Sequence, residues 1–408
     1  MSVKFIDLRS NFKTKFNLIV NGQGVFQFKS TSPYLNLLQF RIYSPDKTTG
    51  IQIEFTEKSV FVTNMMTLKP YIDSTNNQGL SMLDGVSYWF SIDSQNQVLY
   101  GGLGEARKET VIYTYKFPTN KDQHMANKLF LEGLTTIEIS ESSVLPIRLL
   151  RDPITATVPL IIRDTDTLTM SDIAEAKYLP KANLSHVAQQ LYDCISGKKF
   201  MLNDPSFPDF SKAIEYSIKT PGCWCNTTLI SKANEFSKTD PNILETYLRI
   251  TLGQNNGESP GIPYVMEIWP VGHYSPIHSH SEANAIIRVL HGSINVKLFP
   301  FLCPQEKPID PFATADFKKD DITWISPTLN QVHQLTNLAS NKDTCITIQC
   351  YKYDTKDRKH YDYFDYIDSD GKKQQYEPDS DMDFIAFKKL MKEEWSNRNC
   401  WNSAMYLV

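Results

Sequence analysis

Hydrophobic and polar residues mostly alternate along the first part of the chain. The alternation is clear at residues 51–55 (Ile-Gln-Ile-Glu-Phe), and turn-forming residues separate such runs at 44–46 and 93–96. Because side chains of a strand point alternately to its two faces, a period of two predicts half-buried strands. Many short strands divided by turns are typical of a β-sandwich, which we assign to residues 1–140.

The pattern changes after this first domain. Residues 141–184 contain four prolines among short apolar runs, which predicts a connector. Two helices are then predicted from apolar residues three or four positions apart, the first preceded by Ser185 as N-cap. These apolar residues are Val187, Leu191, Cys194 and Ile195 in the first helix and Phe210, Ala213, Ile214 and Ile218 in the second.

Short strands are predicted from about residue 244 onward, including 264–269, 285–290, 294–299 and 344–351. Helices followed by strands indicate a β-barrel with a small helical cap, over residues 185–408. The acidic and aromatic stretch 361–383 is predicted to be a solvated loop. Phe384, Phe387 and Met391 then outline a closing helix.

Composition narrows the class of function. The chain has 408 residues, enough for two domains, and a formal net charge of −4 with no basic run, which argues against nucleic acid or an anionic membrane as partner. The first seven residues carry charges where a signal peptide needs an apolar core, and no apolar stretch is long enough to span a membrane. We therefore expect a cytoplasmic protein that acts on a small molecule, with its seven cysteines reduced.

Three histidines form the candidate metal site. His278 and His280 are two residues apart, so in an extended strand their imidazoles project to the same side, and His333 supplies a third. Neutral imidazole suits iron, zinc, copper or nickel. Three such ligands leave coordination positions open, which favours catalysis over a structural role.

The residues around these histidines resemble the two motifs of cupins, which are jelly-roll barrels. Gly272, His278, His280 and Gly292 match the first motif, and Pro327, His333 and Asn337 match the second. Ala285 stands where many cupins have a metal-binding glutamate, and Asp321 replaces a glycine. The resemblance implies a cupin barrel whose three-histidine site has no negative charge from the protein, so a substrate must supply the anion.

Within the cupins, residues 185–365 resemble cysteine dioxygenase type I. The run from Trp269 through His273 and Ser275 to His280 carries this resemblance, together with the Tyr-Leu-Arg segment at 247–249. It implies an Fe(II) cofactor and the oxidation of L-cysteine by O2 to cysteine sulfinic acid. It assigns Tyr351, Arg249 and Tyr247 to catalysis and Arg249, Tyr247 and Trp269 to substrate binding.

The chemistry agrees with this resemblance and identifies two departures. Arg249 offers a planar fork to a substrate carboxylate, which favours an amino-acid thiol over cysteamine. Ala285 stands where animal members carry a cysteine cross-linked to the active-site tyrosine, so that link cannot form. The family's Ser-His-Tyr relay becomes Thr347, Gln349 and Tyr351, and glutamine cannot shuttle a proton.

Residues 30–118 resemble the β-sandwich domain named after farnesoic acid O-methyltransferase, notably at 85–93 and 99–107. We reject methyl transfer because no nucleotide-binding loop is present: the Gly-Gly-Leu-Gly run at 101–104 is predicted to be a hairpin turn. The aromatic residues Tyr88, Trp89 and Tyr100 are predicted in the core rather than at a ligand face. A binding module remains, with a protein or a glycan as its ligand.

Alternatives to cysteine oxidation stay open at this point. The barrel is either a dioxygenase of another small thiol, an oxygenase that uses nickel or manganese, or a metal-binding cupin that acts as a binding or structural module. Gln349 and the attached sandwich motivate the last of these.

Overall fold

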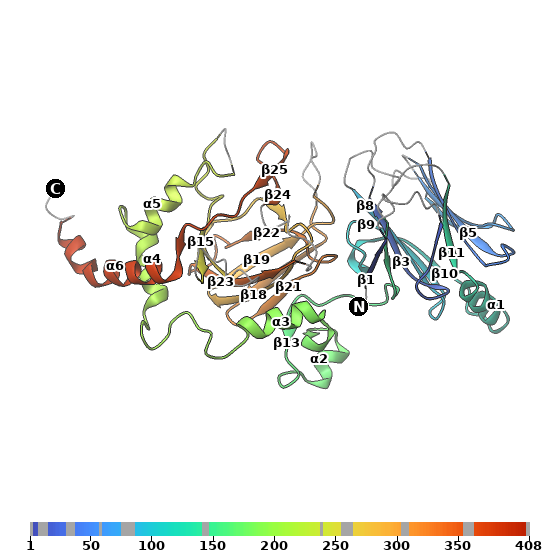
Figure 1. Cartoon of the computed structure of the whole chain (residues 1–408), viewed down its shortest axis with the longest axis horizontal. Coiled ribbons are helices and arrows are strands. Elements are labelled where there is room, and N and C mark those ends of the chain that lie inside the picture. The colour runs from blue at the N-terminus through green and yellow to red at the C-terminus, as the bar shows by residue number, and fades with distance from the viewer. Residues whose placement is uncertain are drawn as a thin grey trace. The chain divides into compact units, whose positions relative to one another are not determined.

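The structure is a computed structural model, and it divides the chain into two compact units, residues 1–158 and 159–408 (Figure 1). It describes residues 3–6, 15–29, 37–56, 59–74, 86–140, 147–236, 240–253, 264–302, 310–353 and 363–404. The boundary lies within the segment 141–184 that we interpreted as a connector. That segment is divided between the units, because its strand at Ile147–Leu150 belongs to the first unit.

Unit 1 is a β-sandwich of two six-stranded sheets. The sheet orders are β1-β12-β3-β8-β9-β10 and β2-β11-β4-β5-β6-β7. The elements are β1 (Val3–Ile6), β2 (Lys15–Asn17), β3 (Gln23–Lys29), β4 (Leu37–Tyr43), β5 (Gly50–Thr56), β6 (Val60–Asn64), β7 (Pro70–Ser74), β8 (Ser87–Asp93), β9 (Val98–Leu103), the 3-10 helix η2 (Lys108–Thr110), β10 (Val111–Lys116), α1 (Lys121–Glu132), β11 (Thr136–Ser140) and β12 (Ile147–Leu150).

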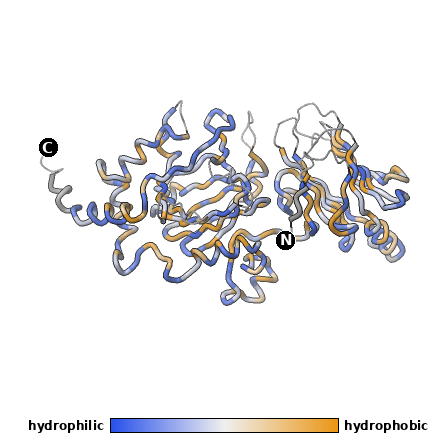
Figure 2. The backbone as a smooth tube through the Cα atoms, viewed as in Figure 1, coloured by the Kyte–Doolittle hydropathy of each residue, from blue (hydrophilic) through white to orange (hydrophobic). Residues whose placement is uncertain are grey.

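Aromatic side chains from both sheets fill the interior of the sandwich. Phe28 of β3 lies 4.9 Å from Phe40 of β4 and 5.3 Å from Phe55 of β5, measured between ring centroids. Figure 2 shows hydrophobic stretches along the strands of this unit. Tilted and edge-on aromatic contacts add to the burial of apolar area, so this cluster holds the two sheets together. The predicted sandwich is confirmed.

The aromatic residues Tyr88, Trp89 and Tyr100 are buried, as predicted for core residues. The Trp89 indole N–H donates to the hydroxyl of Thr110 at 3.2 Å, which satisfies its one donor. Helix α1 was not predicted from the sequence. It begins after Asn120, whose side chain accepts a hydrogen bond from the backbone N–H of Gln123 at 3.0 Å.

Gly101 and Gly102 lie within strand β9, so the prediction of a hairpin turn over residues 101–104 was wrong. The physical reason is the neighbouring indole. A Cβ at Gly102 would lie 2.3 Å from two ring carbons of Trp89, so only glycine lets the strand pass this ring.

Substituting Gly102→Ala should therefore destabilise unit 1, by about 1–3 kcal/mol, because the Trp89 ring or the strand must move. Thermal unfolding of the full chain, followed by circular dichroism, measures the effect. Gly197→Ala in unit 2 is the control, because a Cβ there meets nothing within 4 Å. An unchanged transition for Gly102→Ala would contradict the packing argument.

Unit 2 is a jelly-roll barrel made of two six-stranded sheets. Their orders are β21-β18-β23-β16-β15-β26 and β20-β19-β22-β17-β24-β25. The elements are β13 (Ile162–Arg163), α2 (Met170–Ala174), β14 (Leu179–Pro180), the 3-10 helix η3 (Lys181–Asn183), α3 (His186–Ile195), α4 (Phe210–Lys219), α5 (Trp224–Ser231), β15 (Leu248–Leu252), β16 (Tyr264–Trp269), β17 (Ile277–Ser279), β18 (Asn284–His291), β19 (Ser293–Leu298), β20 (Ala313–Lys318), β21 (Ile322–Ile325), β22 (Val332–Thr336), β23 (Cys345–Lys352), β24 (Phe364–Ile367), β25 (Lys373–Tyr376), β26 (Met382–Asp383) and α6 (Phe384–Ala404).

The predicted helices of unit 2 are confirmed at α3, α4 and α6. Ser185 is the N-cap of α3 and accepts from the backbone N–H of Ala188 at 3.2 Å. Helices α4, α5 and α6 gather beside strand β15 (Figure 1), where Phe387 of α6 packs against Phe210 of α4. Among the described residues no helix is both long and apolar enough to cross a membrane.

The prediction of a loop over residues 361–383 was wrong for the part that the structure describes. Strands β24, β25 and β26 lie there, and β24 pairs with β17 while β26 pairs with β15. Phe364 and Tyr366 of β24 are buried, because this strand lies between β17 and β25 in the second sheet, next to the histidines. Asp365, the one acidic residue of β24, forms an ion pair with Lys373 of β25 at 2.9 Å.

Candidate metal centre and adjoining cavity

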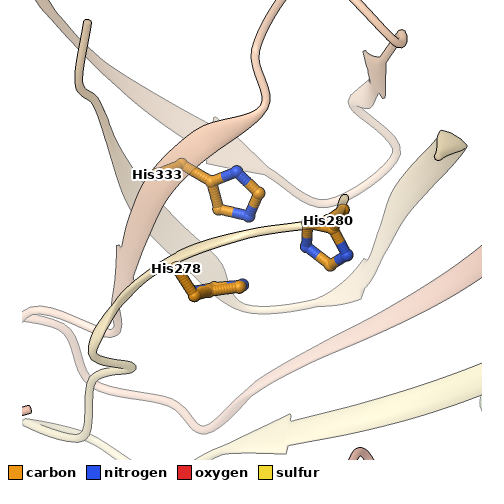
Figure 3. Close-up of side chains that lie close together, drawn as sticks. All are labelled: His278, His280 and His333. Atoms are coloured by element: carbon orange, nitrogen blue, oxygen red, sulfur yellow. The ribbon is translucent and has the colours of Figure 1, made fainter. Parts of the chain in front are cut away.

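The three predicted histidines come together on the inner side of the barrel. His278 of β17 is the direct cross-strand partner of His333 in β22, and His280 follows β17. Figure 3 shows the three imidazoles turned toward a common space. A ring nitrogen of each lies within 4.8 Å of the others, and the group can hold a metal ion. The i and i+2 spacing together with the strand pairing produces this convergence.

Backbone carbonyls orient two of the rings. Nδ1 of His278 donates to the carbonyl of Pro276 at 3.1 Å, and Nδ1 of His333 donates to the carbonyl of Asn330 at 3.2 Å. An N–H on Nδ1 leaves Nε2 with its lone pair, which is the arrangement of most histidine ligands. Nδ1 of His280 is buried without a partner among the described residues. The donor set therefore fits a metal ion.

Burial keeps these imidazoles neutral. It lowers the pKa of His278 to about 4 and the pKa values of His280 and His333 well below their usual range, and neighbouring imidazoles add to the shift for the last two. Neutral imidazole is the form that binds a metal. The cluster is thus ready to bind a cation at neutral pH with no prior loss of protons.

No carboxylate joins the three histidines in the part of the chain that the structure describes. Ala285, at the position where many cupins have glutamate, is fully buried and is the direct cross-strand partner of Tyr351. The ring of Tyr351 stacks on that of His280, with centroids 5.3 Å apart. The site thus has three neutral ligands with a tyrosine beside them.

A cavity of about 50 Å³ opens next to the histidines. A water molecule needs roughly 10–15 Å³ by this measure, so the cavity has room for a small ligand. Its walls include all three histidines and three of the other predicted site residues, Tyr247, Arg249 and Trp269. The remaining wall is mainly apolar, which strengthens electrostatic interactions inside.

Tyr247 and Trp269 form one wall of the cavity as a stacked pair, with ring centroids 4.2 Å apart. Tyr247 lies directly before β15, and Trp269 is the last residue of the neighbouring strand β16. Burial raises the pKa of the Tyr247 hydroxyl above its ordinary value, so it stays protonated. The two rings can therefore contact a bound molecule through their surfaces, and they carry no charge.

A row of polar side chains crosses the first sheet from β15 to β23. Nη1 of Arg249 donates to Oε1 of Glu267 at 2.9 Å, and Nε2 of Gln349 donates to Oε2 of Glu267. The hydroxyl of Tyr351 donates to Oε1 of Gln349. Nε2 of Gln349 also lies 3.4 Å from the hydroxyl of Thr347, so the three relay positions are adjacent in space.

The sequence analysis missed one member of this row, Glu267. Its side chain is 5% exposed and that of Arg249 6%, so the two form a buried ion pair in the cavity wall. Glu267 is two residues before Trp269, which places both on the same face of β16. Its charge was the signal that could have identified it, because Glu267 stands on the same strand face as Trp269, which was predicted to bind the substrate.

Comparisons with known proteins add little to this geometry. No family model matches the sequence, and no curated protein matches it. Similar solved structures include the cupin domain of Schizosaccharomyces pombe Cnp3, 16% identical with a TM-score of 0.21, which covers 27% of this chain and 66% of that one. A cupin 2 domain-containing protein from Halorhodospira halophila is 16% identical with a TM-score of 0.21, covering 34% of this chain and 73% of that one.

A putative sugar phosphate isomerase from Acidithiobacillus ferrooxidans is 13% identical with a TM-score of 0.23, over 33% of this chain and 79% of that one. The strand order and the histidine cluster of unit 2 therefore carry the assignment of a jelly-roll barrel with a candidate metal site.

Proposed function

We propose that unit 2 is an Fe(II)-dependent thiol dioxygenase that converts L-cysteine and O2 to cysteine sulfinic acid. The observation that carries the proposal is a cluster of three neutral histidines, two of them buried and His278 half-buried, without a carboxylate among the described residues, at a cavity that also contains Arg249. Such a cluster leaves the full charge of a bound divalent ion uncompensated, which favours an anionic ligand such as a thiolate.

Bound iron would supply open positions for thiol and O2 and lower the pKa of the thiol. In the balanced reaction both oxygen atoms of O2 form bonds to sulfur, which is oxidised by four electrons while O2 is reduced by four. The chain's own residues orient the substrate. Nε of Arg249 is buried without a partner among the described residues, so this edge of the guanidinium is free for a carboxylate.

The experiment is anaerobic loading of the full chain with Fe(II), followed by measurement of O2 uptake and product mass with L-cysteine. We expect O2 consumption and a product heavier than cysteine by two oxygen atoms. Metal content is measured on the same preparation, and loading with nickel or manganese tests the two other metals. Absence of uptake with L-cysteine, cysteamine and 3-mercaptopropionate would overturn the proposal.

Tyr351 is proposed to act on the bound substrate through its hydroxyl. Burial raises its pKa well above the ordinary value, so the hydroxyl stays protonated at neutral pH, and it would donate to the substrate in place of Oε1 of Gln349, which accepts from it in the structure. Tyr351→Phe should lower kcat about 10- to 100-fold, the effect of losing one buried hydrogen bond, while metal content stays unchanged. Steady-state O2 uptake measures it, with Tyr353→Phe as the control from the same apolar cluster. Equal losses in both variants would contradict a specific role for Tyr351.

A second candidate function is a metal-binding barrel without turnover, used as a binding or structural module. Gln349 favours it, because a glutamine between Tyr351 and Glu267 cannot relay a proton. Metal that stabilises the protein in thermal unfolding, with no thiol oxidised, would support this candidate.

For the N-terminal sandwich we propose a binding module for a protein or a glycan. Tyr88, Trp89 and Tyr100 are core residues, so any ligand face lies elsewhere on the unit.

A further inference from the structure

The charges in the cavity wall are already balanced before any substrate enters. Among the described residues that line the cavity, Arg249 and Glu267 are the only ones with full charges, and they are paired at 2.9 Å. A free guanidinium in this position would leave a buried, unpaired cation whenever the substrate had no carboxylate. Because Glu267 pairs with Arg249, this protein avoids the free-energy cost of a buried, unpaired cation.

Glu267 is fixed in place through both of its oxygens. Oε1 accepts from Arg249 and Oε2 accepts from Gln349, and the three side chains stand on neighbouring strands. The carboxylate cannot turn away from the guanidinium without also losing its bond to Gln349. An incoming carboxylate therefore meets a guanidinium that already has an anion at Nη1, while its Nε is without a partner among the described residues.

We propose that Glu267 is a specificity-determining residue, which extends the substrates of this site to aminothiols without a carboxylate, such as cysteamine. The inference rests on the proposed thiol dioxygenase function. By pairing with Arg249, Glu267 weakens the attraction of the site for an α-carboxylate, and it leaves no unpaired charge when the substrate lacks one. The resemblance to cysteine dioxygenase alone predicts a site that favours amino-acid thiols over cysteamine.

The test compares L-cysteine with cysteamine in the wild-type protein and in Glu267→Gln, with the full chain loaded with Fe(II). The glutamine has the shape of glutamate and can still accept from Arg249, but has no charge. We expect the ratio of kcat/KM for L-cysteine to that for cysteamine to rise about tenfold in the variant, because the repulsion between the Glu267 carboxylate and the substrate carboxylate is removed. A ratio is independent of the fraction of active protein, so partial unfolding does not affect it.

Anaerobic calorimetry provides a second measurement that needs no turnover. The ratio of the two dissociation constants should shift in the same direction and by a similar factor. If the wild-type protein oxidises neither thiol, the proposed function fails, while the binding ratio still decides the role of Glu267. Unchanged ratios, or a shift toward cysteamine, would overturn the inference.

Further variants complete the design. Asp321→Asn removes another buried carboxylate from an ion pair of the same barrel, with Arg163, outside the cavity, and should leave both ratios unchanged. Arg249→Gln should shift both ratios toward cysteamine, since the cation is lost and Glu267 then repels a substrate carboxylate. If Glu267→Gln does not fold, the double variant Arg249→Gln/Glu267→Gln decides. Its ratios should shift back toward L-cysteine relative to Arg249→Gln, and ratios equal to those of Arg249→Gln would overturn the inference.

Discussion

His333→Ala should lose its metal and, with it, all measurable thiol oxidation. The substitution removes one of only three ligands and leaves two imidazoles, which hold a divalent ion far more weakly. Loss of a residue that merely supports a ligand costs about 10- to 100-fold in metal affinity, so loss of a ligand itself should cost roughly 100-fold or more. Elemental analysis after gel filtration measures the metal, and O2 uptake measures the activity.

Thermal unfolding adds a measurement that does not depend on turnover. Metal that binds the folded state raises the unfolding temperature of the wild-type protein, and His333→Ala should show no such rise. His273→Gln is the matched control, because His273 is also buried but bonds through Nδ1 to the carbonyl of Thr246, away from the cluster. Retention of metal by His333→Ala, or its equal loss in His273→Gln, would contradict the three-histidine site.

The clustering of the three histidines could be predicted from the sequence because its signal is local. His278 and His280 need only a strand to point the same way, and the motif around His333 resembles a known one. Arg249 and Tyr247 were found through a short matching segment on one strand. All seven predicted site residues lie at or beside the cavity, and Tyr351 is placed there by its stacking on His280.

Strand β24 could not be predicted in the same way. Its sequence, Phe-Asp-Tyr-Ile, lies in a stretch of acidic residues whose composition is typical of a loop. It pairs with β25 on one side and, on the other, with β17, more than eighty residues earlier in the chain, and the place beside β17 buries Phe364 against His280. Pairing between segments so far apart in the chain is hard to predict from local composition, because it depends on the residues of the partner strand.

The partner of Arg249 was missed for a related reason. Glu267 lies in an otherwise apolar strand. The alternation of residues along that strand predicts which sheet face Glu267 occupies, but not which residue of the next strand lies opposite it. Strand pairing makes it the direct cross-strand partner of Arg249. The sequence analysis therefore assigned the guanidinium of Arg249 to a substrate carboxylate. In the structure, one nitrogen of this group already donates a hydrogen bond to a carboxylate of the protein.

Arg249→Met should destabilise unit 2 by about 3–5 kcal/mol at neutral pH, because it leaves the carboxylate of Glu267 buried without its cation. Burial lowers the pKa of the Arg249 guanidinium, but Glu267 and the neighbouring tyrosines together raise it above its ordinary value, so the arginine is charged in the folded protein. Urea denaturation of the metal-free protein measures the effect. Tryptophan fluorescence reports mainly on unit 2, because Trp89 is the one tryptophan of unit 1.

The pH dependence of the stability lost in Arg249→Met separates an effect of charge from an effect of packing. Burial raises the pKa of Glu267, and Arg249 opposes that shift, so the pKa rises further in Arg249→Met. A carboxyl whose pKa is higher in the folded state binds more protons there, so the free energy of unfolding falls as pH rises above the unfolded pKa. The variant should therefore be closer to wild type at pH near 5 than at pH near 8, over a window that starts at about 4.3.

The double variant Arg249→Met/Glu267→Leu is the control for this prediction. Replacing both charges by apolar side chains of similar size leaves no buried charge unpaired, and Nε2 of Gln349 keeps the hydroxyl of Thr347 as acceptor, so most of the lost stability should return. The double variant should also lose the pH dependence, since the carboxyl is gone. If it is as unstable as Arg249→Met at every pH, the loss comes from packing around residue 249, and the buried pair is not what stabilises this wall of the cavity.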